Sequence, residues 1–336
     1  MHRLHNYALT FALACLIILL NGCRTDDNGY TIPEDVNYSG TGSVTQGIGT
    51  ATNRNIYPQG TRNAPLGIIT SLRFQNWTVP ADVEFSNRQF PTASDLYHPD
   101  DAPNSNTQQA LDKLRDDDII TVDEGGEVIT GFILTDNYFE LYVNGVQVGK
   151  DAIPYTPFNS HIVQFRVNRP FTLAMSLVDW EENLGLGSEE NGGTRYQPGD
   201  GGMVAYFQDS TGAFVAKSDA AWHAQVYYIS PIQDLECPSE QGSVRNTSAC
   251  STEGTDQGAG FYGLHWNVPE NWETEGFDDS DWPSAIEFSN ATVGLESDPA
   301  YANFTDVFDN GAHDARFIWT SNLVLDNWVL VRYTVN

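Results

Sequence analysis

Apolar and polar residues alternate with a period of two over much of the chain after residue 66. Phe139, Leu141 and Val143 are spaced in this way, and Asn144-Gly145 follows them directly. A period of two places alternate side chains on opposite faces of a β-strand, and Asn-Gly favours the type I′ turn of a hairpin. We therefore predict an all-β protein whose strands are separated by turns rich in Gly, Asn and Pro.

One helix is expected within this β region, at residues 105–116. The segment begins with Ser and Asn, which are good N-cap residues, and continues with helix-forming residues. Ala110, Leu111 and Leu114 form one short apolar stripe. The pattern predicts a single short helix near 105–116.

The first 65 residues have a different pattern. An apolar run from Tyr7 to Leu20 follows a short basic head, as in a secretory signal, and is shorter than the roughly 20 residues that a membrane-spanning helix needs. Residues 24–65 are poor in apolar side chains and rich in Gly, Asn, Thr and Ser, which predicts a tether. We therefore expect a signal peptide over 1–22, a flexible tether over 23–65 and a β-sandwich region over 66–336.

The signal ends in Leu20-Asn21-Gly22-Cys23. This ending resembles the lipobox of bacterial lipoproteins, although Asn21 replaces the small or β-branched residue usual at its position. The resemblance implies that Cys23 is lipidated and anchors the protein to a membrane, and Arg24 after it favours the outer membrane or cell surface. The alternative is an ordinary cleaved signal followed by a chance cysteine.

Charge and cysteine content narrow the partners and the compartment. The chain has 45 Asp and Glu against 16 Lys and Arg, a net charge of −29 that repels nucleic acid, so we expect no nucleic-acid partner. An acidic protein also attracts divalent cations, which would favour a metal site. A solvated acidic surface without a metal explains the acidic composition equally well. Cys237 and Cys250 lie in one polar loop of an exported chain, with no histidine close in sequence, so we predict a disulfide rather than a metal site. It would stabilise by roughly 3 kcal/mol.

Two longer stretches carry recognisable motifs. Residues 136–177 contain a strand pattern, Asn144-Gly145, Tyr-Thr-Pro-Phe and a further strand pattern. Residues 272–335 contain Gly-Phe-Asp-Asp-Ser-Asp-Trp-Pro and then two strand patterns. They resemble the second and first halves of the galactose-binding-like jelly roll that appends sugar recognition to β-galactosidases, β-glucuronidases and α-L-rhamnosidases. The resemblance implies a galactose-binding-like jelly-roll β-sandwich.

These halves occur in the reverse of the family's order. A circular permutation explains the reversal, because the termini of a domain often lie close together at its surface. Residues 66–235 and 260–336 would then be two parts of one permuted jelly roll, joined by the disulfide-stapled loop 236–259. Two separate sandwiches are the alternative. A single roll requires strands of both parts to share the same sheets.

Motifs for catalysis are missing from the sequence. It contains no H-E-x-x-H and no G-x-S-x-G, and the family's catalytic carboxylates lie in a separate barrel domain for which no length remains. Retaining and inverting glycosidases differ in the distance between their two catalytic carboxyl groups. Carboxylates are so abundant in this chain that this distance cannot single out a catalytic pair. We expect a protein that is not an enzyme and has no organic cofactor.

The loop after residue 178 is the first binding candidate. Sugars bind through an aromatic ring against their apolar face and through polar side chains on their hydroxyls, often on loops of a rigid scaffold. The candidate residues are Asp179, Trp180, Glu181, Glu182, Asn183, Arg195 and Asp200, with the adjacent pair His265 and Trp266 as a second group, of which one member must face outward. In the alternative interpretation, Trp180 plugs the end of the sandwich and the carboxylates solvate a loop.

Asp278, Asp279 and Asp281 are candidates for a structural Ca²⁺ site, since Ca²⁺ prefers oxygen ligands. The alternative is that they cap a turn through bonds to backbone amides. Three function classes follow from these observations. We favour a surface-tethered carbohydrate-binding module that binds polysaccharide or glycan, ahead of a structural or adhesive envelope protein and a metal-binding surface protein.

Overall fold

A computed structural model describes residues 37–59, 62–97, 107–155, 160–191, 193–254, 258, 260–294 and 307–336. It also describes the short strands β1 (Arg24–Thr25) and β2 (Thr31–Ile32), which pair antiparallel. The chain divides into two compact units, residues 1–36 and 37–336. Cys23 lies outside the described residues, so its lipidation stays a prediction.

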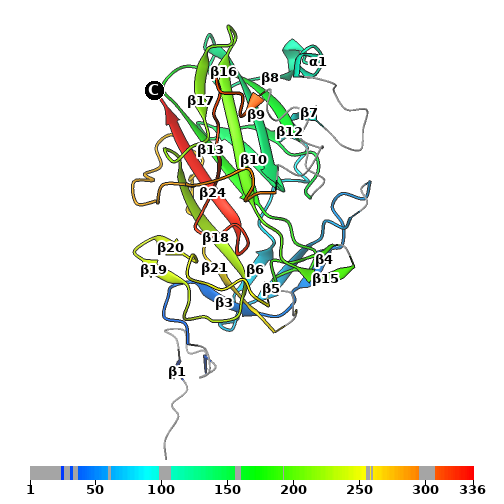
Figure 1. Cartoon of the computed structure of the whole chain (residues 1–336), viewed down its shortest axis with the longest axis vertical. Coiled ribbons are helices and arrows are strands. Elements are labelled where there is room, and N and C mark those ends of the chain that lie inside the picture. The colour runs from blue at the N-terminus through cyan, green and yellow to red at the C-terminus, as the bar shows by residue number, and fades with distance from the viewer. Residues whose placement is uncertain are drawn as a thin grey trace, which may run out of the picture. The chain divides into compact units, whose positions relative to one another are not determined.

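Two large sheets form the body of this unit (Figure 1). The first has the order β11 (Val146–Lys150), β10 (Tyr138–Val143), β13 (Phe171–Val178), β24 (Asp326–Val335), β18 (His223–Ile232), β21 (Tyr262–His265) and β3 (Ser43–Gln46). The second has the order β22 (Ile286–Phe288), β23 (Phe317–Trp319), β16 (Gly202–Asp209), β9 (Glu127–Asp136), β12 (Ser160–Val167) and β7 (Ser94–Tyr97), with β17 (Phe214–Lys217) beside β16 and β8 (Ile119–Thr121) beside β12.

The two sheets pack face to face. Phe139 on β10 contacts His161 on β12, with ring centroids 5.2 Å apart, and Phe165 on β12 contacts Phe171 on β13 at 5.8 Å. The predicted all-β sandwich is therefore confirmed. The predicted helix is present as α1 (Thr107–Leu111), followed by the 3₁₀ turn η1 (Asp116–Asp118). No helix among the described residues is long and apolar enough to cross a membrane.

Strands from the two predicted parts share both sheets. β24 lies between β13 and β18, where Val331 pairs with Met175 on one side and with Ala224 on the other. In the second sheet, β23 pairs with β16 through Ile318 and Met203. Residues 66–235 and 260–336 therefore belong to one compact sandwich.

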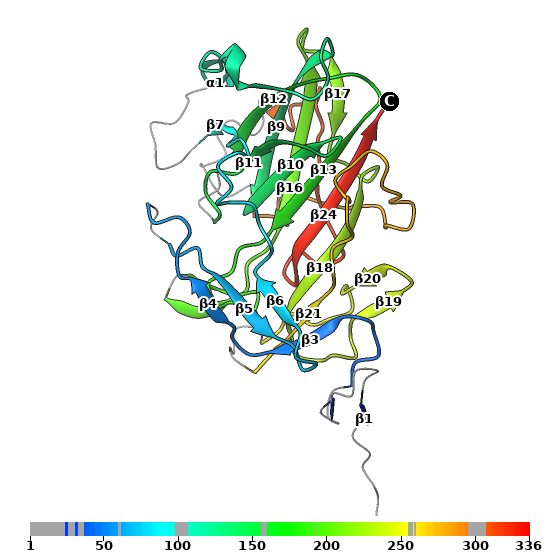
Figure 2. The same cartoon turned by 180° about the vertical axis from the view of Figure 1, so that it is seen from behind.

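Three small sheets complete the unit: β4 (Thr50–Asn53), β5 (Leu66–Thr70) and β6 (Asn76–Val79); β14 (Glu189–Asn191) and β15 (Thr194–Gln197); β19 (Ser239–Gln241) and β20 (Val244–Asn246). The first of them lies at the end of the sandwich opposite α1, next to β15 (Figures 1 and 2). The predicted disulfide joins Cys237 to Cys250, whose Cα atoms are 5.0 Å apart.

The tether prediction is wrong for the described residues that form β3 and β4. β3 is the edge of the seven-stranded sheet and pairs with β21 through Val44 and Leu264. Thr45 is buried and lies 3.0 Å from the ring of His265. A polar segment is ordered here because a neighbouring strand satisfies its backbone and supplies the apolar partners that the segment itself lacks.

Candidate functional site

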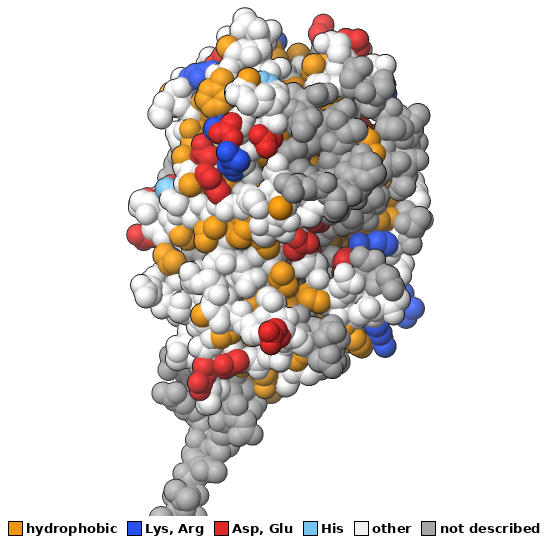
Figure 3. All heavy atoms as spheres, viewed as in Figure 1, with side chains coloured by type: hydrophobic (Ala, Val, Ile, Leu, Met, Phe, Trp, Pro, Cys, Tyr) orange, Lys and Arg blue, Asp and Glu red, His pale blue; other side chains and the backbone are white. Residues whose placement is uncertain are grey.

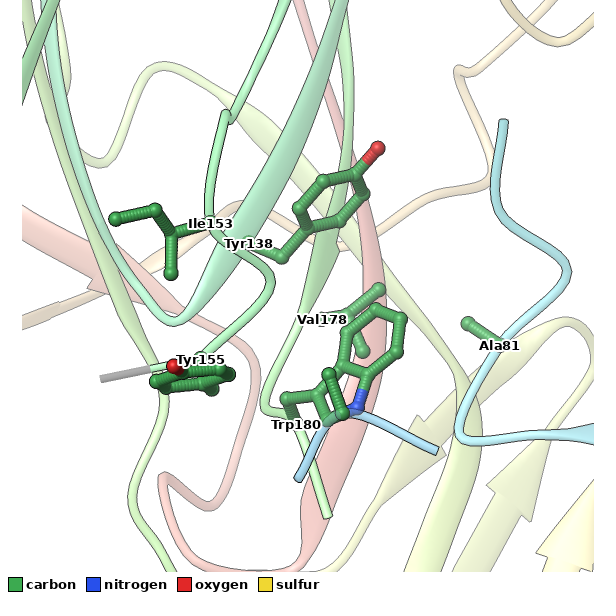
Figure 4. Packing of buried hydrophobic residues seen from close by; sticks show 7 residues of the cluster. Ala81, Tyr138, Ile153, Tyr155, Val178 and Trp180 are labelled. Atoms are coloured by element: carbon green, nitrogen blue, oxygen red, sulfur yellow. The ribbon is translucent and has the colours of Figure 1, made fainter. Parts of the chain in front are cut away.

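Trp180 lies in the core and not on a surface. Its side chain is 1% exposed and belongs to a buried cluster with Tyr138, Tyr155 and Val178 (Figure 4). The rings of Trp180 and Tyr138 meet edge to face at 5.7 Å. The plug interpretation is therefore correct, and Trp180 offers no free ring face to a sugar.

Glu181 stabilises the conformation of the loop that follows β13. Its carboxylate accepts hydrogen bonds from the backbone N–H groups of Gly185 (2.7 Å) and Gly187 and from the Tyr228 hydroxyl (3.0 Å). Both glycines have positive φ, which lets the chain turn around the carboxylate. Burial raises the pKa of Glu181 to about 7, although these hydrogen bonds oppose the rise. Glu181 is therefore a structural residue, not a ligand-binding one.

Asn183 also serves the loop itself. Its side-chain amide donates to the Arg195 carbonyl at 2.7 Å and lies 3.3 Å from the Ser188 hydroxyl. These bonds tie β14 and β15 to the loop after β13. Arg195 itself is exposed, and its guanidinium lies over the Tyr196 ring, 5.1 Å from the centroid.

Arg62 connects this loop to the segment before β5. Its Nε donates to Glu182 Oε1 at 2.9 Å, its Nη2 donates to Glu182 Oε2 at 3.2 Å, and Nη2 also contacts Glu189. Glu182 Oε2 accepts a further bond from the Glu190 N–H at 2.6 Å. A bidentate guanidinium–carboxylate pair fixes direction as well as distance, so this pair positions Glu182.

Buried carboxylates lie beneath the same loop. Burial, together with the charge of neighbouring carboxylates, raises the pKa of Asp136 and of Asp179 well above its usual value. Burial and then the charge of Glu189 raise the pKa of Asp200 to about 6. Arg62 is the cation that opposes the shifts of Asp136 and Asp179. In the part of the chain that the structure describes, no three Asp, Glu, His or Cys residues are placed to hold a metal ion.

A cavity of about 280 Å³ opens between this loop and the segment around β4. Its walls are Ile48, Gly49, Ala51, Arg54, Asn63 and Pro65 on one side, and Glu182, Leu184 and Glu190 on the other. The Gly49 N–H donates to the Leu184 carbonyl at 2.7 Å, which joins the two walls. The cavity therefore lies between segments far apart in the sequence.

The lining of this cavity combines apolar and polar groups. Ile48 is 43% exposed and Leu184 is buried, so aliphatic side chains form part of the wall. Arg54 and Asn63 supply N–H donors, and Glu182 and Glu190 supply carboxylate acceptors. Of the predicted binding residues, Glu182 alone belongs to this lining.

His265 and Trp266 are both buried, so the expectation that one of them faces outward is wrong. The His265 ring stacks between Trp77 and Tyr228, at centroid distances of 5.3 and 4.5 Å. Burial lowers the pKa of His265 to about 3. Gly42, just before β3, lies close against the Trp266 ring, and the Arg245 guanidinium lies over it, 4.5 Å from the centroid; no pattern in the sequence indicates either contact.

The Asp278–Asp281 turn is closed by the protein's own groups. Asp279 Oδ2 accepts a hydrogen bond from Arg332 Nε at 2.8 Å, and Asp279 Oδ1 lies 3.3 Å from His223. Asp278 accepts the N–H of Ser280 at 3.1 Å, and Asp281 is exposed. The turn-capping interpretation accounts for Asp278, and an ion pair to β24 accounts for Asp279. No Ca²⁺ role follows from these contacts.

Sequence reasoning missed Ile48, Arg54 and Asn63, because composition assigned them to a tether. Thr50 and Thr52, with the smaller Ala51 between them, were the available signal for a strand. Comparison of the chain with family models, curated proteins and solved structures gives no match.

Proposed function

We propose that this protein is a non-catalytic binding protein that holds a saccharide in the cavity between β4 and the loop after β13. The observation that carries the proposal is the lining of that cavity. Ile48 and Leu184 provide an aliphatic surface, and Arg54, Asn63 and Glu190 provide donors and acceptors around it. A pyranose has an apolar ring face and a rim of hydroxyls that donate and accept, so the two patterns are complementary.

The rigidity of the site supports the same proposal. Glu181 holds the loop from inside, and Arg62 fixes Glu182 at the cavity wall. A preformed site loses less conformational freedom on binding and so retains more of its interaction energy. At about 280 Å³, the cavity lies just below the roughly 300–1,000 Å³ of drug-sized sites, which suits one sugar unit.

In the proposed site, an aliphatic wall contacts the sugar in place of the stacking ring expected at Trp180. A single sugar unit in a small site binds weakly, but many anchored copies facing one polysaccharide raise the overall avidity by roughly 10²–10⁴. The lipid anchor predicted at Cys23 would provide such an array at a cell surface. A polysaccharide or glycan is therefore the partner that we propose.

The test is a saccharide panel titrated against the purified protein without its predicted signal peptide, followed by amide NMR. We expect shifts at Ile48, Ala51 and Leu184 with at least one saccharide. Ala51→Phe should fill the cavity and weaken binding at least about ten-fold, since Ala51 is exposed on β4 and the change leaves the core intact. Ala220→Phe is the control at an exposed alanine outside the cavity. Equal binding by both variants, or no binding to any saccharide, would refute the proposal.

A further inference from the structure

We infer that the saccharide bound in this cavity is acidic, and that Arg54 binds its carboxylate. The inference rests on the proposed function and adds the ligand class. Its basis is the balance of charge in the cavity wall, which carries the side chains of Arg54, Glu182 and Glu190.

Glu182 is paired with Arg62, a cation that it shares with Glu189. Both of its oxygens accept hydrogen bonds from Arg62, at 2.9 and 3.2 Å. Neither side chain is freely solvated, because the Arg62 side chain is 19% exposed and that of Glu182 is 10% exposed. Glu182 is therefore a fixed, ion-paired part of the wall, and its charge is only partly offset because Arg62 also pairs with Glu189.

Glu190 has a cation of its own nearby. Its Oε1 lies 3.5 Å from the Nε of Arg195, and both side chains are largely solvent-exposed. A pair of this kind is weak and mobile, so Glu190 can still accept a hydroxyl hydrogen bond from a ligand.

Arg54 has no such partner. Within the residues that the structure describes, its guanidinium makes neither an ion pair nor a hydrogen bond, and the side chain is exposed at the cavity. Among the described residues that line the cavity, Arg54 is therefore the cation that remains available to pair with a ligand. The chain as a whole has 16 Lys and Arg against 45 Asp and Glu, which makes an unmatched arginine in a cavity more notable.

The backbone around Arg54 is held in place. Arg54 directly follows β4, and the Asn55 N–H next to it donates to Asn53 Oδ1 at 3.1 Å. Asn55 Oδ1 in turn accepts the N–H groups of Tyr57 and Ala64, each at 3.1 Å. The guanidinium thus projects from a fixed turn, and its fork of N–H groups can bind a carboxylate through two parallel hydrogen bonds.

A uronic acid could contact all of these groups at the same time. Its carboxylate would bind Arg54, its hydroxyls would bond to Asn63 and Glu190, and its ring would lie against Ile48 and Leu184. A neutral sugar makes every contact except the first. The structure therefore predicts a preference for uronates over neutral sugars with the same ring.

The test compares galacturonate, glucuronate and mannuronate with their methyl esters, which keep the ring and remove the charge. Binding is measured by NMR titration of the purified protein. We expect at least one acid to bind about ten-fold or more tightly than its ester. Arg54→Gln should abolish this difference by weakening the binding of the acid far more than that of the ester, and Arg54→Lys should restore part of it. Arg73→Gln, at an exposed arginine outside the cavity, should change nothing.

Three outcomes overturn the inference. If wild type binds each ester as tightly as its acid, while Ala51→Phe still removes binding, the site binds neutral sugars and only the ligand class is wrong. If the acid preference persists in Arg54→Gln, another cation binds the carboxylate. Binding of no saccharide, acidic or neutral, removes the proposed function together with the inference.

Discussion

Arg62 forms a bidentate ion pair with Glu182, a residue 120 positions later in the chain, through contacts of 2.9 and 3.2 Å. Because Arg62 also contacts Glu189, one cation holds both the cavity wall and the start of β14.

Replacing Arg62 with Met should therefore loosen this loop. We expect a loss of about 1–3 kcal/mol in the free energy of unfolding, because charged hydrogen bonds are lost and two shielded carboxylates are left without their cation. Faster amide exchange at Gly185 and Gly187 would locate the effect. Arg169→Met is the control, since its pair with Glu127 is more exposed and should contribute less than about 1 kcal/mol. An equal loss in both variants would contradict a special role for Arg62.

Asp200 should make the stability of this region depend on pH. Burial and the charge of Glu189 raise its pKa to about 6 in the folded protein, above an unfolded value of roughly 3.9. The folded state then holds the proton more tightly, so its stabilising contribution is complete below about pH 4 and is lost as the pH rises through 6.

Asp200→Asn removes this titration. Relative to wild type, the variant should therefore gain stability between pH 4.5 and pH 7.5, measured by urea unfolding at both values. Asp281→Asn, at an exposed position, is the control. A variant whose difference from wild type is the same at both pH values would show that Asp200 does not titrate as described.

His265 should make the stability of the protein depend on pH in the opposite direction. Burial lowers its pKa to about 3, below the unfolded value of roughly 6.5, so the unfolded chain takes up a proton that the folded protein does not. Stability from this residue is present above pH 6.5 and is lost as the pH falls toward 3. His265→Phe keeps a ring between Trp77 and Tyr228 and removes the titration. Relative to wild type, it should become more stable between pH 7 and pH 4 in thermal melts, and a constant difference would contradict this.

The lipid anchor is tested by Cys23→Ala in the native host. Thioether attachment needs the sulfur of Cys23, so the variant should leave the membrane fraction and lose the mass of the lipid. Cys237→Ala is the control, because it removes a cysteine of the disulfide loop and leaves the signal unchanged. Membrane partitioning that is the same in wild type and Cys23→Ala would refute lipidation.

The sequence predicts the strands of this protein better than its site. Phe139, Leu141 and Val143 alternate as expected and are all fully buried. Glu140 between them is buried too, because residues 84–87 cover the other face of β10 and are held there by the Lys150 ammonium, which donates to three of their carbonyl oxygens at 2.7 Å each. That cover arises from contacts distant in sequence, and a period of two does not encode it.

The charge of the chain also does not show where a binding site lies. Figure 3 shows Asp and Glu side chains scattered over the visible face in small groups rather than in one patch. Net charge excludes a class of partner but does not locate a site. The cavity depends on how β4 meets the loop after β13, and the composition of residues 23–65 gave no sign of that meeting.

β3 has a mechanical consequence. It closes one edge of the seven-stranded sheet, and just before it the Thr41 N–H donates to Glu240 at 3.0 Å. Tension applied to the chain ahead of Asn37, such as shear on an anchored cell, would load this clamp and then the β3–β21 ladder. Should β3 peel away, β21 would present unpaired backbone groups to neighbouring molecules. The β3–β21 pairing thus protects a sheet edge, and its loss would expose an edge through which copies of the chain could associate.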